Sequence, residues 1–216
     1  MIEMPVWAIV LAAVAVFIIA MLFRVGVFSK LTYVQKPFPL KYFLYLEHLG
    51  PYSKVYQVFQ NINNNCVPHF KGLKTIAGVF YDSPSDVIDQ NHCRACCGVF
   101  IEESEKEAAL QFAAKNPLYK FKEFPATECV STTFSYHGVL THILMSNKVY
   151  PGLTQYALQN GLVKVECEIP AMIEIYHMHL KPAKIEYVLP YGAGKENFII
   201  TTQPQPAYKP SHKKAK

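Results

Sequence analysis

The sequence predicts an α+β fold, in which an N-terminal transmembrane helix precedes one domain built from two β-α-β-β repeats. Three observations predict it: an uncharged apolar run from Pro5 to Phe23, alternating apolar patterns typical of strands, and two glycine corners that each precede a helical pattern. The chain then divides into a short N-terminus (1–4), the transmembrane helix (5–23), a juxtamembrane linker (24–36), the domain (37–202) and a disordered basic tail (203–216).

The apolar run has the length of a membrane span. At about 1.5 Å per residue it is ~28 Å long, close to the hydrocarbon thickness of a bilayer. A cleaved signal peptide and a buried core helix are the alternatives. A signal peptide has a basic start and a small-x-small cleavage site, whereas here Glu3 precedes the run and Phe23-Arg24-Val25 ends it. An uncleaved anchor is therefore favoured.

The charges that flank this run predict its orientation. Arg24, Lys30, Lys36 and Lys41 follow the run, and no lysine or arginine precedes it. Because basic flanks are retained in the cytosol, we expect a lumenal N-terminus and a cytosolic domain and C-terminus. The sequence contains no Asn-x-Ser/Thr site, and its six cysteines lack the spacing of a disulfide framework. Both features agree with a cytosolic domain.

Composition indicates one folded domain without a nucleic-acid site. The chain is 51% hydrophobic and 13% aromatic, enough for a core of its own. The formal charge is +5, but most of that excess comes from Lys209, Lys213, Lys214 and Lys216 in the tail. A basic binding face for nucleic acid is therefore not predicted.

Both expected repeats have the order strand, helix, strand, strand. In the first, the strand 42–48 leads through Gly50-Pro51 into a helix that ends at the asparagines 63–65, and two strands follow at 76–81 and 95–101. In the second, the strand 129–136 leads through Gly138 into a helix at 139–159 that Pro151 is expected to split, and two strands follow at 171–177 and 184–189.

The order of several short motifs resembles a known family. They are Gly50-Pro51-Tyr52, Tyr81-Asp82-Ser83-Pro84, Cys93-Arg94, Phe124-Pro125-Ala126, Val149-Tyr150-Pro151, Tyr156 and Glu174-Ile175-Tyr176. This order resembles GyrI-like, or effector-binding, domains and in particular the testis-expressed protein 264 family of endoplasmic reticulum autophagy receptors. The resemblance implies a single-pass endoplasmic reticulum membrane protein with a cytosolic GyrI-like binding domain, which acts as a receptor or adaptor for reticulophagy through cytosolic protein partners.

One departure from that family concerns the tail. The family's long acidic tail ends in an aromatic-x-x-aliphatic motif that adds a strand to the autophagy modifier. Residues 203–216 carry neither this motif nor an acidic flank. We therefore expect no direct binding of the modifier through these residues.

The resemblance also implies a ligand site around Glu174. In such domains a glutamate at this place lines a groove for small cationic or amphipathic ligands, and aromatic rings add cation–π attraction. Tyr176 shares a strand face with Glu174, and Tyr81, Phe134 and Tyr136 are candidates for further rings. The alternative is a strand glutamate that pairs with a lysine or is solvated. A membrane-tethered small-molecule sensor or hydrolase using Glu174 is the alternative function.

The cysteines and histidines do not predict a metal, a cofactor or an enzyme. Cys93-x-x-Cys96-Cys97 contains half of a zinc site, but Cys66, Cys129 and Cys167 are isolated. Ordinary buried thiols are therefore expected. The sequence has no nucleophile elbow, phosphate loop or metalloprotease motif.

The last residues, Lys213-Lys214-Ala215-Lys216, resemble a dilysine retrieval signal, which coat proteins read on cytosolic tails. The predicted orientation would present Lys213 and Lys214 to such coats. The alternative is a basic tail that only solvates the chain or is attracted to lipid.

Overall fold

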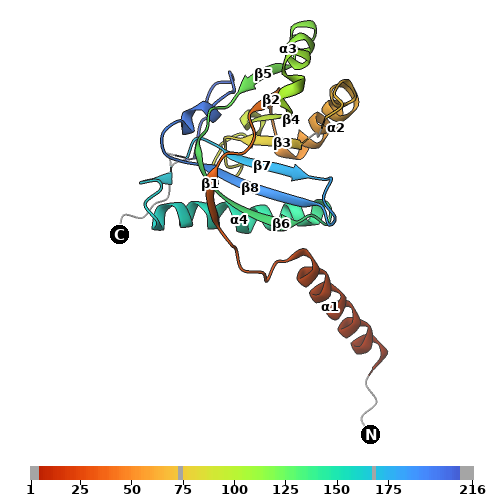
Figure 1. Ribbon diagram of the computed structural model, residues 1–216. Helices are drawn as coiled ribbons and strands as arrows, with labels where there is room; N and C mark the ends of the chain where they lie inside the picture. Colours follow the sequence, from red (N-terminus) through yellow and green to blue (C-terminus); the bar gives the residue numbers. More distant parts are fainter. Residues whose placement is uncertain (1–4, 73–74, 167–168, 210–216) are drawn as a thin grey trace.

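The computed structural model describes residues 5–72, 75–166 and 169–209. Helix α1 (Val6–Val25) extends away from a domain that contains all the other elements (Figure 1). Its segment Val6–Arg24 has a mean hydropathy of 3.0 and no buried part, and among the described residues this is the one helix long and apolar enough to cross a membrane. The apolar helix predicted at residues 5–23 is therefore confirmed.

The domain is built on one eight-stranded antiparallel sheet, which confirms the α+β class. Its strands lie in the order β1-β6-β8-β7-β3-β4-β2-β5. Their bounds are β1 Val34–Pro37, β2 Tyr42–Leu49, β3 Thr75–Phe80, β4 Arg94–Ile101, β5 Lys120–Glu123, β6 Glu128–Ser135, β7 Met172–His177 and β8 Lys184–Pro190. The alternation of apolar side chains in these segments places one set on each face of the sheet.

Helices cover one face of the sheet, and connecting segments cover the other. Helix α2 (Val55–Asn65) packs on β2 and β4, and helix α4 (Val139–Gln159) packs on β6 and β8. Helix α3 (Lys106–Lys115) precedes β5. On the opposite face the aromatic rings of Phe38, Phe124 and Phe198 lie within 6 Å of one another and close the core over β2, β3 and β7.

One predicted helix end is confirmed, and one predicted interruption is wrong. Helix α2 ends at Asn65, within the asparagine run 63–65 where the sequence predicts its end. Helix α4 is continuous across Pro151. The side chains of Val149 and Leu153 on either side are fully buried, while Pro151 lies on the exposed face, so packing holds the helix despite the missing backbone donor.

Two segments predicted to lie outside the domain, the linker 24–36 and the start of the tail 203–216, contact it. The predicted linker 24–36 contains most of β1, which pairs with β6 from Val34 to Pro37. In the predicted tail, Tyr208 forms a bridge with Val87, and the Tyr208 hydroxyl donates to Asp82 Oδ1 at 2.6 Å. Both segments satisfy backbone groups of the domain, which a disordered chain does not do. Residues 210–216 lie outside the described residues.

Candidate functional site

Glu174 lies in the middle of the sheet, on the face that the helices cover. It occupies the centre of β7, opposite Gly78 on β3 and Tyr187 on β8. Its two neighbours along the strand, Ile173 and Ile175, point into the core on the other face. Glu174 is only 1% exposed, so its carboxylate must be satisfied by protein groups.

Two tyrosines donate hydrogen bonds to this carboxylate. The Tyr150 hydroxyl, from α4, donates to Glu174 Oε1, and the Tyr176 hydroxyl, from the same strand, donates to Oε2. Burial, together with the Glu174 charge, raises the pKa of both tyrosines well above the usual range. Both hydroxyls therefore stay protonated near neutral pH and remain donors.

Further aromatic rings surround this pair. Phe59 on α2 contacts the Tyr176 ring at 5.5 Å between centroids, and Tyr136 contacts it at 6.5 Å from the other side. Tyr187 lies edge-on to the Tyr150 ring at 5.7 Å and is fully buried. Among the described residues, its hydroxyl has no hydrogen-bond partner. We call Glu174, Tyr150, Tyr176 and Tyr187 the Glu174 cluster.

A small residue on the neighbouring strand makes room for this arrangement. A Cβ added at Gly78, opposite Glu174, would lie 2.6 Å from the Phe80 ring and 3.3 Å from the Phe59 ring. These rings pack directly over the glycine, which brings Phe59 close to Tyr176. The aromatic wall beside Glu174 thus depends on the absence of a side chain at Gly78.

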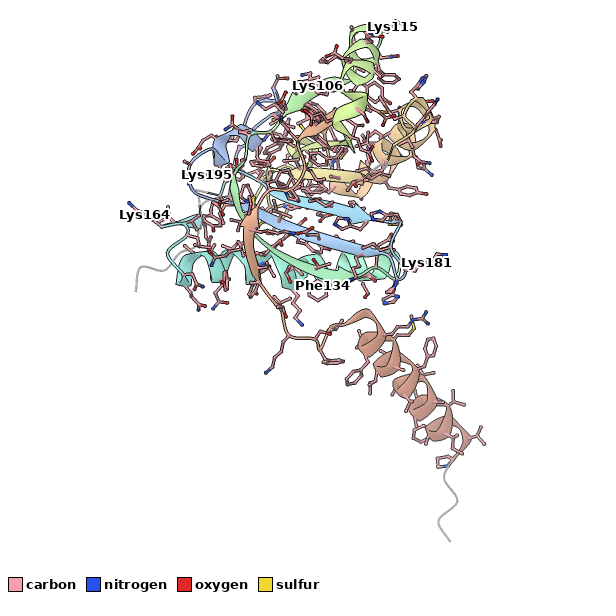
Figure 2. The ribbon with its side chains drawn as sticks, in the orientation of Figure 1. Lys106, Lys115, Phe134, Lys164, Lys181 and Lys195 are labelled. Atoms are coloured by element: carbon pink, nitrogen blue, oxygen red, sulfur yellow. The ribbon has the colours of Figure 1, made fainter. Side chains whose placement is uncertain are left out.

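The structure brings together some of the residues that the sequence singled out. Glu174, Tyr176 and Tyr136 lie on one face, as the strand alternation predicts. Tyr81 does not join them, because it lies on the opposite face and donates its hydroxyl hydrogen to the Phe198 carbonyl at 2.9 Å. Phe134 shares the helix-covered face but lies at the end of β6 that is nearer α1 (Figure 2).

Two members of the Glu174 cluster were missed in the sequence. Tyr150 belongs to a motif that carried the resemblance, but nothing in its helical spacing assigned it to the carboxylate. Tyr187 lies two residues from both Ile185 and Leu189 on β8, so all three side chains share one face. The sequence pattern of β8 was sufficient to predict this. Identification of its partner required the register between β7 and β8.

In this arrangement the Glu174 carboxylate is not accessible to a ligand. Both of its oxygens accept hydrogen bonds from tyrosines, and the side chain is buried beneath α4. A cationic ligand would have to displace Tyr150 or Tyr176 to reach the charge. Glu174 could act as a general base only after the same displacement, because its carboxylate must come within hydrogen-bond distance of the substrate proton.

The thiols offer no nucleophile in the part of the chain that the structure describes. Burial raises the pKa of Cys66, Cys96 and Cys129 to about 12 in each case, and these thiols therefore stay protonated. Within residues 5–72, 75–166 and 169–209, no group of three histidine, cysteine or acidic side chains is placed to hold a metal ion. The predicted sorting residues, Lys213 and Lys214, lie outside these ranges.

Comparisons with known proteins agree on the fold and identify one sequence relative. No family model matches the chain. Human testis-expressed protein 264 is 30% identical over 135 residues, which cover 61% of this chain and 40% of that protein. This chain thus matches less than half the length of that curated relative.

Two solved structures share the fold. The EcmrR C-terminal domain has a TM-score of 0.51 and 14% identity, over 75% of this chain and 98% of that one. EcmrR in a complex with DNA also has a TM-score of 0.51, over 74% of this chain and 57% of that one. The chain is therefore similar in sequence to part of testis-expressed protein 264 and similar in fold to the EcmrR C-terminal domain.

Proposed function

We propose that this chain is a single-pass endoplasmic reticulum membrane protein, whose cytosolic GyrI-like domain serves as an adaptor that binds other proteins. The observation that carries the proposal is that no part of the apolar helix α1 is buried against the domain. An apolar surface of this size in water is very unfavourable, and a bilayer is the environment that removes it. The similarity to testis-expressed protein 264 supports the same conclusion.

The two alternatives for α1 fit the structure less well. A buried core helix would pack its apolar side chains against the domain, whereas Trp7 and Phe17 remain 66% and 67% exposed. A cleaved signal peptide has a basic start and a small-x-small cleavage site, whereas Glu3 precedes this helix and Phe23-Arg24-Val25 ends it. These sequence features favour an anchor that stays attached to its domain.

The GyrI-like assignment is supported by the element order. The segments β2-α2-β3-β4 and β6-α4-β7-β8 follow the same sequence of elements, and β3 and β7 pair at the centre of the sheet. Gly50 and Gly138, which precede the two helical segments, have φ values of 139° and 94°, a region that favours glycine. We infer two copies of one unit that meet along β3 and β7.

The closed Glu174 cluster favours a protein-binding role over small-molecule sensing or hydrolysis. In the alternative functions, Glu174 must meet a ligand cation or a substrate. Here Tyr150 and Tyr176 already occupy its carboxylate, and burial leaves it 1% exposed. The cluster then acts as a buried polar bridge between α4 and β7, while partners bind the outer surface.

Proximity labelling in cells tests the adaptor role. A biotin ligase inserted between Lys209 and Pro210, which leaves Lys213 and Lys214 at the C-terminal end, should label cytosolic proteins and proteins on the cytosolic face of the reticulum. A ligase fused before Met1 should label lumenal proteins. Partners that depend on the domain should disappear when only residues 1–36 carry the same ligase. Equal partner sets for the full chain and for residues 1–36 would contradict a binding role of the domain.

A further inference from the structure

The exit of the chain from α1 is fixed by backbone and side-chain contacts. Gly26 adopts the left-handed conformation and its N–H donates to the Phe23 carbonyl at 3.0 Å, while the Val27 N–H donates to the Leu22 carbonyl at 3.1 Å. This pair of bonds is a Schellman turn, which ends the helix in a defined direction. Lys148 on α4 then donates its ammonium hydrogens to the carbonyls of Val27, at 2.6 Å, and of Ser29.

The next residues continue this attachment to the domain. The Tyr33 ring stacks on the Tyr156 ring of α4 at 4.5 Å between centroids. A Cβ added at Gly152 would lie 2.4 Å from Leu31 Cδ1, so Leu31 packs tightly on the helix at that glycine. Because residues 26–37 are packed on α4 and β6, they do not act as a long free tether. One side of the domain is therefore held toward the end of α1.

That side includes the turn between β7 and β8. A Cβ added at Gly26 would lie 4.0 Å from Phe134 Cδ1, near the end of β6. Just beyond this strand, the Tyr136 N–H donates to the Ala183 carbonyl at 2.7 Å, which joins the β6 end to the β7–β8 turn. Figure 2 shows Lys181 of this turn on the same side as α1, whereas Lys115 lies at the far end of the domain.

The turn combines exposed apolar and basic side chains. Met178 is 53% exposed and Leu180 is 38% exposed. Lys181 and Lys184 are also exposed, and no ion pair involves them in the part of the chain that the structure describes. Exposed apolar side chains beside unpaired lysines are typical of surfaces that contact anionic bilayers.

Carboxylates are absent from the sequence of this side of the molecule. Residues 24–46, 129–165 and 175–185 contain no aspartate or glutamate. These ranges supply the exit from α1, β1, most of β6, all of α4 and the β7–β8 turn. The two glutamates that flank the last range, Glu174 and Glu186, are buried, at 1% and 5% exposure. A negatively charged surface could therefore approach this side without repulsion from a nearby exposed acidic side chain.

We propose that the β7–β8 turn is a second membrane contact, in addition to α1. Met178 and Leu180 enter the headgroup layer of the bilayer, and Lys181 and Lys184 contact the phosphates of anionic lipids. The proposal rests on the proposed function, because α1 must span the membrane to hold the turn at its surface. The contact fixes the tilt of the domain and leaves its opposite end, around α3 and β5, free for cytosolic partners.

Fluorescence quenching by lipids tests this contact in the full chain, reconstituted in vesicles that contain phosphatidylserine and a lipid with a quencher in its headgroup layer. An environment-sensitive dye is attached to a single introduced cysteine in Met178→Cys. Leu118→Cys, whose parent side chain is 80% exposed near the end of α3, is the matched control. Because the five described native cysteines are buried, the parent chain labelled in parallel gives the background.

The expected result is strong quenching of the Met178 dye and weak quenching of the Leu118 dye. Replacing phosphatidylserine with phosphatidylcholine should lower the Met178 quenching at least about twofold, since each lysine loses its anionic lipid partners. Lys181→Glu should lower it similarly in the anionic vesicles, whereas Lys115→Glu, at the far end of the domain, should leave it unchanged.

A third position separates failure of this proposal from failure of the proposed function. Val16, in the middle of α1, is 66% exposed, and a dye at Val16→Cys reports on the membrane span, with a quencher placed deep in the acyl chains. If the Val16 dye is quenched and the Met178 dye is not, the anchor stands and the second contact is wrong. If the Val16 dye is not quenched either, the proposed function is wrong as well. If the Met178 dye is quenched equally in neutral and anionic vesicles, and equally with and without Lys181→Glu, the proposed role of the lysines is wrong.

Discussion

The Tyr176 hydroxyl donates a hydrogen bond to the Glu174 carboxylate, although only Ile175 separates the two residues along β7. Alternate side chains of a strand share a face, so the pair meets on the helix-covered side of the sheet. Tyr150 then reaches the other carboxylate oxygen from α4. One buried charge thus ties a central strand to the helix above it.

This bridge should contribute measurably to stability. Tyr150→Phe removes one donor and leaves Glu174 buried with a weaker set of partners, so the free energy of unfolding should fall by about 1–3 kcal/mol. Tyr56→Phe is the matched control, because Tyr56 is 64% exposed and its hydroxyl accepts a hydrogen bond from the exposed Gln60 amide. It should change stability by less than about 0.5 kcal/mol. Urea unfolding of the full chain in detergent, followed by circular dichroism, measures both, and equal effects would show that the bridge has no stabilising role.

The buried carboxyl group of Glu186 should make the free energy of unfolding depend on pH. Burial alone would raise the pKa of this carboxyl, but hydrogen bonds from His177, Lys36 and Ser131 outweigh it and lower the pKa to about 2. Because this value lies below the ordinary 4.5, the contribution of Glu186 to stability is complete above pH 4.5 and is lost as the pH falls toward 2.

Glu186→Gln removes that contribution. The variant should be less stable than the parent at pH 7 by about 2–3 kcal/mol, and the difference should shrink between pH 4.5 and pH 2. Glu128→Gln, at the exposed start of β6, is the control and should follow the parent at every pH. Acid titration of the unfolding free energy measures the three chains. A constant gap between Glu186→Gln and the parent across this range would argue against the lowered pKa.

The segment that ends at Lys209 should detach when its tyrosine anchor is removed. The Tyr208 hydroxyl donates to Asp82, which also pairs with Arg94 at 2.8 Å, and the Lys209 N–H donates to the Asp86 carbonyl at 2.7 Å. Tyr208→Phe should therefore raise the rate of hydrogen exchange of the Lys209 N–H about 5- to 30-fold, the factor that 1–2 kcal/mol represents. Tyr191→Phe, which loses a hydroxyl contact to Gln35, is the control and should leave this rate unchanged. The same rate in all three chains would refute the anchoring role of Tyr208.

The dilysine at Lys213 and Lys214 stays a prediction. Changing both to serine should let the chain leak from the reticulum to the Golgi or the cell surface, because coat proteins read lysine side chains near a cytosolic C-terminus. Changing both to arginine separates recognition of lysine from an effect of charge. If the tail acts only through its charge, the arginine variant should stay in the reticulum almost as well as the parent chain. Microscopy of the tagged chain, with the tag on the N-terminal side, measures the distribution. Full reticulum residence of the serine variant would reject retrieval by this motif.

Local patterns predicted most of the sheet, because strand alternation and glycine corners are local signals. The predicted strand 129–136 and the observed β6 differ by one residue at each end, and Gly50 and Gly138 mark turns as expected. The order of the strands in space could not be read in this way. It depends on long-range pairs such as Gly78 with Glu174, which only the register fixes.

The errors have one physical origin, which is packing that overrides local propensity. Pro151 predicts a break, but buried residues on both sides keep α4 continuous across it. Residues 34–36 and Tyr208 are predicted to lie outside the domain, yet residues 34–36 pair with β6 and Tyr208 forms a bridge with Val87. For the candidate site, alternation placed Tyr176 beside Glu174 correctly. Only the tertiary structure shows that Tyr81 lies on the opposite face of the sheet and that Tyr150 reaches the carboxylate from a helix.

The most direct test of the proposed anchor uses glycosylation as a reporter of topology. The chain has no Asn-x-Ser/Thr site of its own, so one can be added in a short spacer before Met1 or after Lys216 in two otherwise identical chains. The account predicts that microsomes glycosylate the N-terminal site and not the C-terminal site, and that the chain resists alkaline extraction. Glycosylation of the C-terminal site, or release of an unglycosylated chain into the alkaline supernatant, would contradict a membrane anchor with a cytosolic domain.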